Sequence, residues 1–553
     1  MKYLKKILPL ILFTTAVCFF FAFKGDNHNF EIAKNLDIFN AIVKEVDMFY
    51  VDTVKPQELI EGAIDGMLDQ LDPYTVYYGE EDKSELKLMT TGKYAGVGAV
   101  IRYNKDKGYV VIAEPYEDMP ALKAGLRAGD IILQIDGKDM KGKQVDEVSN
   151  ALRGDVGTTV VVTVERPGSK SHLNLKVERD NIQLPSVPYY GMIKNNTGYV
   201  ILNQFTENCS KDVRKAIIDL KQQGATSLIL DLRGNLGGLE QEAVEVVNLF
   251  VGKGVTIVSN RGKTKQATRD YSTSKEPLDT HIPLVVLVNN QTASSSEIVA
   301  GALQDLDRAV IIGTRTYGKG LVQIPRDLPY STNLKITVAK YYIPSGRCIQ
   351  AINYAERNQD GSVARIPDSL THVFHTLAGR EVRDGGGILP DIVTKATLPN
   401  IVSYLVNDDI IFDYATNYRL AHPTIGPASE FRISDADYEQ FKEMVKNGKF
   451  DYDRISVKAF NTLKEAAKFE GYLDDSKPEF DALEKKLQHN IDHDLNLFSA
   501  DIKEFINDEI VKRYYYQKGS IANQIQYDTD IAQAISTLGD ADAYKALLLP
   551  KKQ

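Results

Sequence analysis

The 553-residue sequence contains no tryptophan and only three cysteines, Cys18, Cys209 and Cys348. Three cysteines cannot form a disulfide framework, and we interpret Cys209 and Cys348 as small buried hydrophobic residues. The sequence also lacks a Gly-x-Ser-x-Gly elbow and a His-Glu-x-x-His helix, which excludes the hydrolase designs built on them. A basic character is missing as well, because the net charge is −9. That balance argues against a nucleic-acid partner.

The sequence does contain enough apolar material for several domains. Its 43% hydrophobic and 25% charged residues are typical of a globular protein, and its length predicts about three or four domains. At the start, Lys2, Lys5 and Lys6 precede an uncharged run over residues 7–23. We assign residues 1–25 to a signal peptide or membrane anchor. This predicts export to the periplasm or to the extracytoplasmic face of a membrane.

The most informative stretch, residues 289–323, reads NNQTASSSEIVAGALQDLDRAVIIGTRTYGKGLVQ. The apolar run Leu284–Val288 before it predicts a buried strand, and residues 309–312 predict a second one. A hydroxyl-rich turn over residues 292–296 and a helix lie between the two strands. A glycine-rich loop carrying Lys319 follows the second strand. If the strands are parallel neighbours, both loops open at the same edge of the sheet, where open α/β sheets place their sites.

Both loops also have ordinary explanations. Serine-rich turns before helices are usually N-caps, a role that fits Ser296, and a lone lysine in a glycine loop is usually solvated. The loop from Gly313 to Lys319 matches seven positions of a nucleotide-binding P-loop. The next position must be Ser or Thr to hold Mg²⁺, but it is Gly320, and residues 321–324 lead to a proline. The sequence therefore argues against a nucleotide site.

Serine chemistry offers a sharper interpretation. A serine hydroxyl needs a base to become a nucleophile, and no histidine of the chain lies in a context that suggests this task. A lysine amine can serve if burial depresses its pKa, and Ser–Lys pairs are a known variant of the catalytic triad. Lysine has no second nitrogen for an orienting partner, so a neutral amide such as that of Gln323 can hold the amine in place.

The runs TASSSEIVAGALQD and YGKGLVQ resemble the carboxyl-terminal processing (tail-specific) serine peptidases. The resemblance implies that Ser294 is the nucleophile, that Lys319 is the base, and that Gln323 orients the base. Thr292 stands where serine is usual in that family, and Ser295 stands where alanine is usual. Ser295 is therefore a second candidate hydroxyl, but the interval of 25 residues to the lysine favours Ser294.

Asp305 matches an aspartate of supporting role in the same family. Two local alternatives stand beside that role, namely a helix cap and an ion pair with Arg308.

A second run of the family's type, DLRGNLGG, covers residues 231–238. Glycines at the carboxyl end of a strand let backbone amides approach a reacting carbonyl group. The resemblance implies an oxyanion hole built from Gly237 or Gly238 together with the amide of Ser295. The alternative is a plain turn before a helix over residues 239–250. The preceding strand–helix–strand unit is predicted at residues 198–205, 213–220 and 227–230.

The segment from Tyr94 to about Arg166 resembles a PDZ domain. A glycine-bearing loop, YAGVGAVI, leads into a strand, and the later run AGLRAGDIILQIDG is the more specific of the two signals. Such a loop receives the terminal carboxylate of a peptide that adds a strand beside the helix Val145–Leu152. The implied peptide-binding residues are Tyr94, Gly96, Val97 and Gly98. The alternative is a β-rich insert that binds no ligand.

The remaining segments are predicted to be helical. Residues 26–92 carry apolar residues at helical spacing, and so does the extension over residues 398–553. In the extension we expect a capped helix over residues 434–448. We also expect one longer amphipathic helix along Phe480, Leu483, Leu487, Ile491 and Leu495.

These segments together predict a multidomain α/β protein. We expect a PDZ-like domain at residues 93–178, a peptidase core at 179–397 and the helical segments on either side. The predicted function is an exported serine endopeptidase that recognises C-terminal tails, without metal or organic cofactor. Its partners are protein or peptide substrates, a membrane if the first segment is retained, and in one possible arrangement further copies of itself. The alternative is a non-catalytic envelope scaffold that binds tails.

Overall fold

The computed structural model describes residues 28–550 apart from 81–87, 89, 359–361, 396–397, 449 and 488–489. The chain divides into two compact units. The smaller unit comprises Met1–Tyr77 and Pro325–Ile336, and the larger comprises Tyr78–Ile324 and Thr337–Gln553. The predicted targeting segment lies outside the described residues. Among the residues that are described, no helix is long and apolar enough to cross a membrane.

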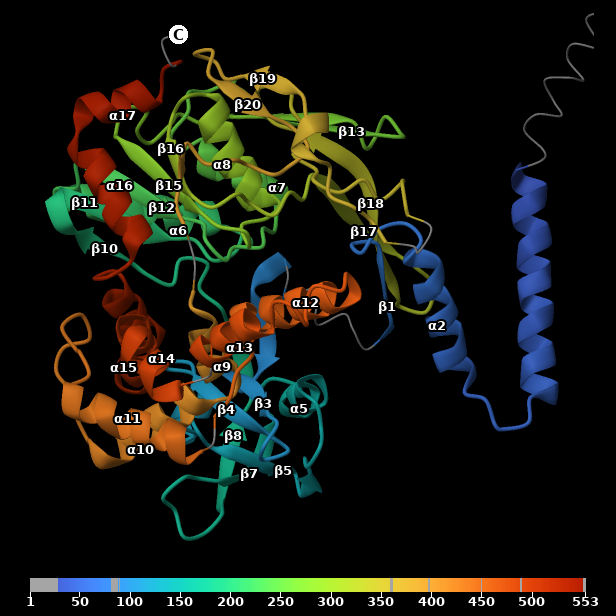
Figure 1. Ribbon diagram of the computed structural model, residues 1–553. Coiled ribbons are helices and arrows are strands. Elements are labelled where there is room, and N and C mark those ends of the chain that lie inside the picture. The colour runs from blue at the N-terminus through green and yellow to red at the C-terminus, as the bar shows by residue number, and fades with distance from the viewer. Residues whose placement is uncertain are drawn as a thin grey trace, which may run out of the picture. The chain divides into compact units, whose positions relative to one another are not determined.

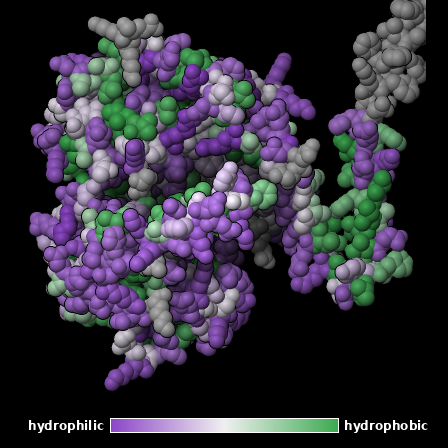
Figure 2. Space-filling view, viewed as in Figure 1, coloured by the Kyte–Doolittle hydropathy of each residue, from purple (hydrophilic) through white to green (hydrophobic). Residues whose placement is uncertain are grey.

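The smaller unit contains the predicted N-terminal helices. One helix spans residues 28–49, and α2 spans Pro56–Leu68. Pro56 opens α2, at a position where its missing N–H group costs nothing. Apolar side chains such as Leu36 and Ile42 lie exposed on the first helix, and Figure 2 shows hydrophobic side chains along it.

The larger unit is built around a six-stranded sheet with the order β10-β11-β12-β15-β16-β21 (Figure 1). All neighbours are parallel except the edge pair β10 and β11. The expected parallel pairing of β15 with β16 is therefore confirmed. The strands are Tyr190–Ile193, Thr197–Ile201, Ser227–Asp231, Leu284–Val288, Val310–Gly313 and Ile392–Val393.

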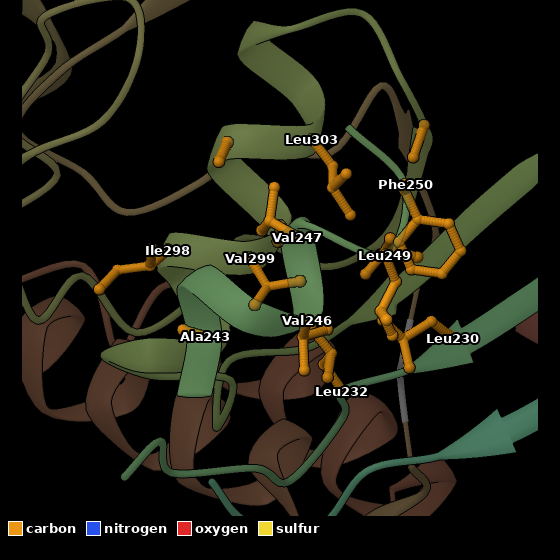
Figure 3. Packing of buried hydrophobic residues seen from close by; sticks show 14 of the residues in the cluster. Leu230, Leu232, Ala243, Val246, Val247, Leu249, Phe250, Ile298, Val299 and Leu303 are labelled. Carbon is orange, nitrogen blue, oxygen red and sulfur yellow. The ribbon is translucent and has the colours of Figure 1, made fainter. Parts of the chain in front are cut away.

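Side chains of β15 alternate between two hydrophobic cores. Leu284 and Val286 face a cluster formed with α6 (Cys209–Gln222), α7 (Glu240–Val247) and α8 (Ser295–Asp305). Figure 3 shows part of this cluster, with Val246 and Val247 of α7 beside Val299 and Leu303 of α8.

The other face of the sheet is covered by the C-terminal extension. Val285 and Leu287 pack with residues of α16 (Thr529–Gly539) and α17 (Ala541–Leu547). Because both faces of β15 are buried, its sequence is an uninterrupted apolar run instead of an alternating one. The extension thus supplies one of the two layers that enclose the sheet.

A second sheet in the chain contains β13 (Thr256–Gly262), β14 (Arg269–Ser272), β17 (Leu321–Asp327) and β18 (Asn333–Tyr342). β19 (Val373–His375) and β20 (Glu381–Arg383) form a separate hairpin. The two cysteines of the core differ. Cys209 is buried as predicted, whereas Cys348 is only half-buried, so that part of the prediction is wrong.

The PDZ-like domain is a β-rich module with its own core. Its sheet has the order β3-β4-β5-β7-β8, so β3 is an edge strand, and α5 lies beside it. β2 pairs with β9, which joins the two ends of the module to the rest of the chain. The strands are β2 Lys93–Gly96, β3 Ala99–Asn104, β4 Tyr109–Pro115, β5 Ile131–Ile135, β6 Lys138–Asp139, β7 Thr159–Glu165, β8 Leu173–Glu178 and β9 Asp180–Gln183. The helices are α4 Pro120–Lys123 and α5 Val145–Leu152.

The extension is helical, as predicted, but one predicted helix is wrong. The apolar series from Phe480 to Leu495 is divided between α13 (Lys477–Lys486) and α14 (Ile491–Leu497). Asn490 caps α14 by accepting a hydrogen bond from the His493 amide, and such a cap starts a new helix. The capped helix expected after Ser434 is α11. The remaining helices are α9 Asn400–Asn407, α10 Ile410–Ala421, α11 Asp435–Asn447, α12 Ile455–Phe469 and α15 Ser499–Gln524.

The PDZ-like domain contacts this extension. Asp409, which is 6% exposed at the N-cap of α10, pairs with Arg102. It also accepts a hydrogen bond from Asn104 Nδ2 at 2.7 Å. Phe412 of α10 packs against Val111 of β4. The PDZ-like domain is therefore held by the extension as well as by β2 and β9.

Candidate active site

Ser294 occupies a special backbone position at the carboxyl edge of the sheet. It is the N-cap of α8 and has a φ of 57°, a conformation that non-glycine residues seldom adopt. The predicted cap, Ser296, is wrong. Its hydroxyl instead donates to the carbonyl oxygen of Asn235 at 2.9 Å. The hydroxyl-rich turn thus leaves Ser294 half-buried at the start of the helix, while the hydroxyls of Ser295 and Ser296 bond to the neighbouring loop.

Lys319 lies in the loop between β16 and β17, so no helix follows the glycine-rich run, in agreement with the argument against a P-loop. The backbone around Lys319 is held by several hydrogen bonds. Gly320 N–H donates to Gln350 Oε1 at 2.7 Å, and Ala351 N–H donates to the Gly318 carbonyl at 2.9 Å. The loop is therefore a fixed part of the core.

A buried carboxylate ties the two loops together. Glu297 is 0% exposed, and its Oε2 accepts hydrogen bonds from the amides of Ser294 and Lys319, both at 2.9 Å. Its Oε1 accepts from Thr316 Oγ1 at 2.5 Å and from Gly318 N–H at 2.8 Å. Burial raises the pKa of Glu297 to about 7, although all four hydrogen bonds act in the opposite direction.

The sequence had assigned no role to Glu297. The only local signal is its place three residues after the N-cap, which is typical of a capping box. That signal accounts for the bond to the Ser294 amide. The bonds to Thr316, Gly318 and Lys319 carry no sequence signal, because they depend on where the loop after β16 passes.

Tyr341 of β18 ties the same two residues from the carbonyl side. Its hydroxyl oxygen lies 2.6 Å from the carbonyl oxygen of Lys319 and 3.1 Å from that of Ser294, so its one hydrogen bridges both carbonyls in a bifurcated hydrogen bond. The side chain is 1% exposed. Ser294 and Lys319 are thus joined through both their amides and their carbonyls.

Gln323, predicted to orient the lysine, lies on β17. Its Nε2 donates to Thr337 Oγ1 on β18 at 3.1 Å. That bond fixes the amide group, with its oxygen as the remaining acceptor.

The DLRGNLGG loop packs directly against the serine turn. A methyl group on Gly237 would lie 2.8 Å from Ser294 Cβ and 3.0 Å from the Ser295 amide nitrogen, so only glycine fits there. Gly237 N–H donates to Asn235 Oδ1 at 2.9 Å. The amides of Gly238 and Ser295, in contrast, make no hydrogen bond to any residue within the described ranges. The structure thus brings Gly237, Gly238 and Ser295 to one place beside Ser294.

Asp305 closes the far end of α8. It pairs with Arg347 at 2.7 Å, and the two side chains are 0% and 1% exposed. It also accepts from the Ser345 amide at 3.0 Å. Arg308, the partner considered from the sequence, instead donates to the carbonyl oxygens of Phe250 and Asp279. Asp305 therefore anchors α8 to the segment after β18.

The predicted peptide-binding residues lie apart from these loops, in the PDZ-like domain. Tyr94 and Gly96 are on β2, and Val97 and Gly98 lead into the edge strand β3. The carbonyl of Val97 accepts from the Ala121 amide at 2.7 Å. Gly98 has a φ of 75°, and a methyl group there would lie 2.7 Å from Met119 Cβ. The loop therefore needs glycine at this position.

The described residues contain no group of three or more His, Cys, Asp or Glu side chains placed to hold a metal ion.

Family models match four successive parts of the chain. Peptidase family S41 matches residues 196–356, and a PDZ domain matches residues 111–166. The "Activating protease CtpB N-terminal domain" matches residues 23–82. The "Probable PDZ-protease, C-terminal helical domain" matches residues 401–538.

One similar protein decides the family. A carboxy-terminal-processing protease of Bartonella bacilliformis is 39% identical over 323 residues, which are 58% of this chain and 73% of that protein. This chain belongs to the carboxyl-terminal processing serine peptidases of family S41, with a PDZ domain. A probable CtpA-like serine protease of Staphylococcus aureus is 35% identical over 318 residues, 57% of this chain. The chain spans less than two thirds of that relative, namely 62%.

Solved structures of similar proteins include the photosystem II D1 C-terminal processing protease. It is 30% identical, with 65% of this chain and 87% of that chain covered and a TM-score of 0.36. The PDZ domain of a carboxy-terminal protease from Vibrio cholerae, solved in complex with peptide, is 28% identical. The match covers 17% of this S41 chain and 99% of that domain, with a TM-score of 0.15.

The family and the multidomain α/β fold predicted from the sequence are confirmed, the family by the Bartonella relative and the fold by the architecture itself.

Proposed function

We propose that this S41 peptidase hydrolyses peptide bonds with a dyad of Ser294 and Lys319. The observation that carries the proposal is the double tie between their backbones. Glu297 accepts from both amides, and the Tyr341 hydroxyl bridges both carbonyls. A hydroxyl and an amine anchored on one such frame suit the activation of a serine by a neutral lysine.

In the proposed reaction, Ser294 Oγ attacks the scissile carbonyl carbon while the Lys319 amine accepts the hydroxyl proton. The lysine then gives that proton to the leaving amine. A water molecule next attacks the acyl carbon while the lysine amine takes one of its protons, and the lysine passes this proton to Ser294 Oγ as the bond from the acyl carbon to Oγ breaks, which releases the new C-terminal carboxylic acid. Gln323 Oε1 is the acceptor that orients the amine. A neutral acceptor suits this task because it leaves the proton affinity of the amine low.

The oxyanion that forms during attack needs donors with no other partner. The Gly238 and Ser295 amides meet that condition within the described residues, whereas the Gly237 amide donates to Asn235. We therefore assign the oxyanion hole to Gly238 and Ser295, with Gly237 as the residue that lets the loop approach. Each such donor contributes about 3–4 kcal/mol to transition-state stabilisation.

We further propose that the PDZ-like domain selects substrates by their C-terminal residues. Its edge strand β3 lies beside α5 and next to the glycine-bearing loop at Gly96 and Gly98. An extended peptide can pair with such a free edge while its terminal carboxylate meets the loop amides. The lysines and the uncharged run of the first 23 residues support export of the whole chain.

The dyad is tested by single substitutions in the purified chain, incubated with a peptide mixture whose new C-termini are mapped. Ser294→Ala and Lys319→Ala should each abolish cleavage while circular dichroism stays unchanged. Ser295→Ala is the comparison variant. It keeps the backbone amide but loses the hydrogen bond from Ser295 Oγ to the Gly238 carbonyl, so it should lower cleavage without abolishing it. Loss with Ser295→Ala and activity with Ser294→Ala would move the nucleophile by one residue. Activity that survives all three substitutions would remove the dyad, and tail binding without any cleavage would favour the scaffold function.

A further inference from the structure

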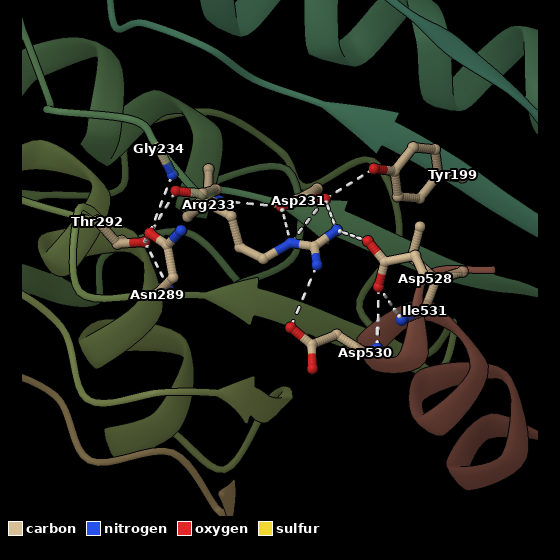
Figure 4. Close-up of polar contacts among 10 residues, drawn as sticks. Tyr199, Asp231, Arg233, Gly234, Asn289, Thr292, Asp528, Asp530 and Ile531 are labelled. Atoms are coloured by element: carbon tan, nitrogen blue, oxygen red, sulfur yellow. Dashed lines mark hydrogen bonds and ion pairs between the residues drawn. The ribbon is translucent and has the colours of Figure 1, made fainter. Parts of the chain in front are cut away.

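Arg233 is the residue of the DLRGNLGG loop that the proposed reaction leaves without a task. Its guanidinium forms a two-pronged pair with Asp231, with Nε 3.0 Å from Oδ1 and Nη2 2.6 Å from Oδ2. The rest of the guanidinium faces the C-terminal extension. Nη2 lies 2.8 Å from Asp528 Oδ2, and Nη1 lies 3.2 Å from Asp530 Oδ2 (Figure 4).

Asp528 has two tasks at once. Its Oδ1 caps α16 by accepting from the amides of Asp530 and Ile531 at 2.9 and 3.0 Å. Its Oδ2 pairs with Arg233. A guanidinium at the N-terminal, positive end of a helix is unfavourable by itself, so the two carboxylates are what make this contact attractive.

On the side that faces the C-terminal extension, Arg233 is held by ion pairs more than by close packing. A cavity of about 490 Å³ adjoins the loop, with Asp231, Arg233 and Asp528 in its lining. The Arg233 side chain is 20% exposed, and those of Asp528 and Asp530 are 21% and 16% exposed. Partly buried, bidentate arginine pairs have a defined geometry, which makes them suited to fixing a position.

The position of Arg233 sets the position of the oxyanion loop. The next residue, Gly234, donates its amide to Asn289 Oδ1 at 3.0 Å (Figure 4). Asn235 then accepts from the Ala293 amide at 3.0 Å, and Gly238 accepts from Ser295 Oγ at 2.9 Å. Three of the five residues after Arg233, namely Gly234, Asn235 and Gly238, are thus tied to the segment that carries Ser294, so that a shift at the start of the loop is passed to the oxyanion donors.

We propose that Arg233 is a positioning residue for the oxyanion hole, and that Asp528 and Asp530 of the helical extension complete its site. The extension is then a working part of the catalytic centre in addition to being a cover for the sheet. The inference rests on the proposed function only in assigning the consequence to the oxyanion. The ion pairs and their effect on the loop stand without it.

The test is the double variant Asp528→Asn and Asp530→Asn in the full chain. Asparagine is as good an N-cap as aspartate, so the substitution removes the charge pairs and keeps the cap of α16. The matched control is Asp540→Asn, which caps α17 through the Ala543 amide in the same extension and does not touch Arg233. Asp530→Glu keeps the charge and serves as the conservative variant.

The double variant should lower kcat on the order of 10-fold or more, as expected for a loosened oxyanion donor, with KM within about threefold of wild type. Amide hydrogen exchange over residues 231–238 should become faster. The melting temperature should match that of Asp540→Asn, and Asp530→Glu should retain kcat.

Two results would overturn the inference. One is a kcat within about twofold of the control together with unchanged exchange in the loop. The other is an activity loss matched by an equal loss of folded protein. If the measured cleavage survives Ser294→Ala, the proposed function fails instead, and hydrogen exchange in the loop still decides the inference by itself.

Discussion

At the scale of single residues, Glu297 is the side chain whose burial costs free energy and whose hydrogen bonds hold the two proposed catalytic residues in place. A carboxylate with 0% exposure loses its hydration, and this loss raises its pKa to about 7. Four donors compensate it, two on each oxygen. The site therefore exchanges stability for a fixed arrangement of Ser294 and Lys319.

The raised pKa has a defined consequence for stability. The folded-state pKa of Glu297 lies above its usual value of 4.5, so the stabilising contribution is full below about pH 4.5 and is lost as pH rises through about 7. The change amounts to up to about 3 kcal/mol. In urea titrations between pH 4.5 and 7, Glu297→Gln should flatten the fall in the free energy of unfolding with pH.

Glu297→Gln should also lower kcat by about 100-fold or more, because the NH₂ group of glutamine would replace a carboxylate oxygen that accepts from two donors, and these two donors would then have no acceptor. Glu240→Gln is the control. Burial also raises the pKa of Glu240, which is half-buried, but its partner is Asn260. An equal loss of activity in both variants would assign the effect to the buried charge in general.

At the scale of elements, the approach of β15 and β16 places the two loops. Val288 and Gly313 are the last register pair of these strands. Gly313 has a φ of 134°, and a methyl group there would lie 1.9 Å from the Val288 carbonyl oxygen. The strand ends are thus closer than any side chain at residue 313 allows, which directs both loops to one edge.

Gly313→Ala should therefore force the strand ends apart and displace the loop that carries Lys319. We expect a loss of about 2–4 kcal/mol in the free energy of unfolding, in the range of overpacked core positions, together with loss of cleavage. Gly346→Ala is the control. Gly346 has a φ of 85° but no atom within 4 Å of an added methyl group, so it should cost only about 1–2 kcal/mol. Denaturant unfolding measures the loss of stability in each variant, and kcat measures the loss of cleavage. Similar results for the two variants would contradict the steric argument.

At the scale of the larger unit, the PDZ-like domain is connected in two ways. The β2–β9 pair joins it to the core, and the contact of Arg102 with Asp409 joins it to the extension. The extension in turn reaches Arg233 through Asp528. From these connections we expect the domain to gate the site, and a domain that only tethers substrate is the alternative.

Deletion separates gating from tethering. Removing residues 97–179 and joining Gly96 to Asp180, which are register partners, by a short linker keeps the β2–β9 pair. Gating predicts that turnover of short peptides without a recognised tail changes by about tenfold or more in either direction. Arg102→Ala is a milder variant that keeps the groove and breaks the docking, and it should shift turnover in the same direction. Unchanged turnover in both variants would leave a simple tether.

The sequence by itself determined the features that repeat locally. The uninterrupted apolar run predicted β15, and the resemblance to a PDZ domain gave the bounds of α5, Val145–Leu152. The spacing of TASSSE and YGKGLVQ sufficed to select Ser294 and Lys319 as candidates and to indicate the family. Such signals can be found in the sequence because each is carried by one continuous stretch of the chain.

Only the tertiary structure decided which distant groups meet. Glu297 contacts residues about twenty positions away, Asp305 pairs with Arg347 in place of Arg308, and Arg233 pairs with Asp530, 297 positions away in the sequence. The spacing of the apolar residues likewise did not predict the break between α13 and α14. The identity of a charged residue in the sequence does not indicate which partner its side chain has. The partner is chosen by the path of the backbone and by the burial that makes an unpaired charge too costly.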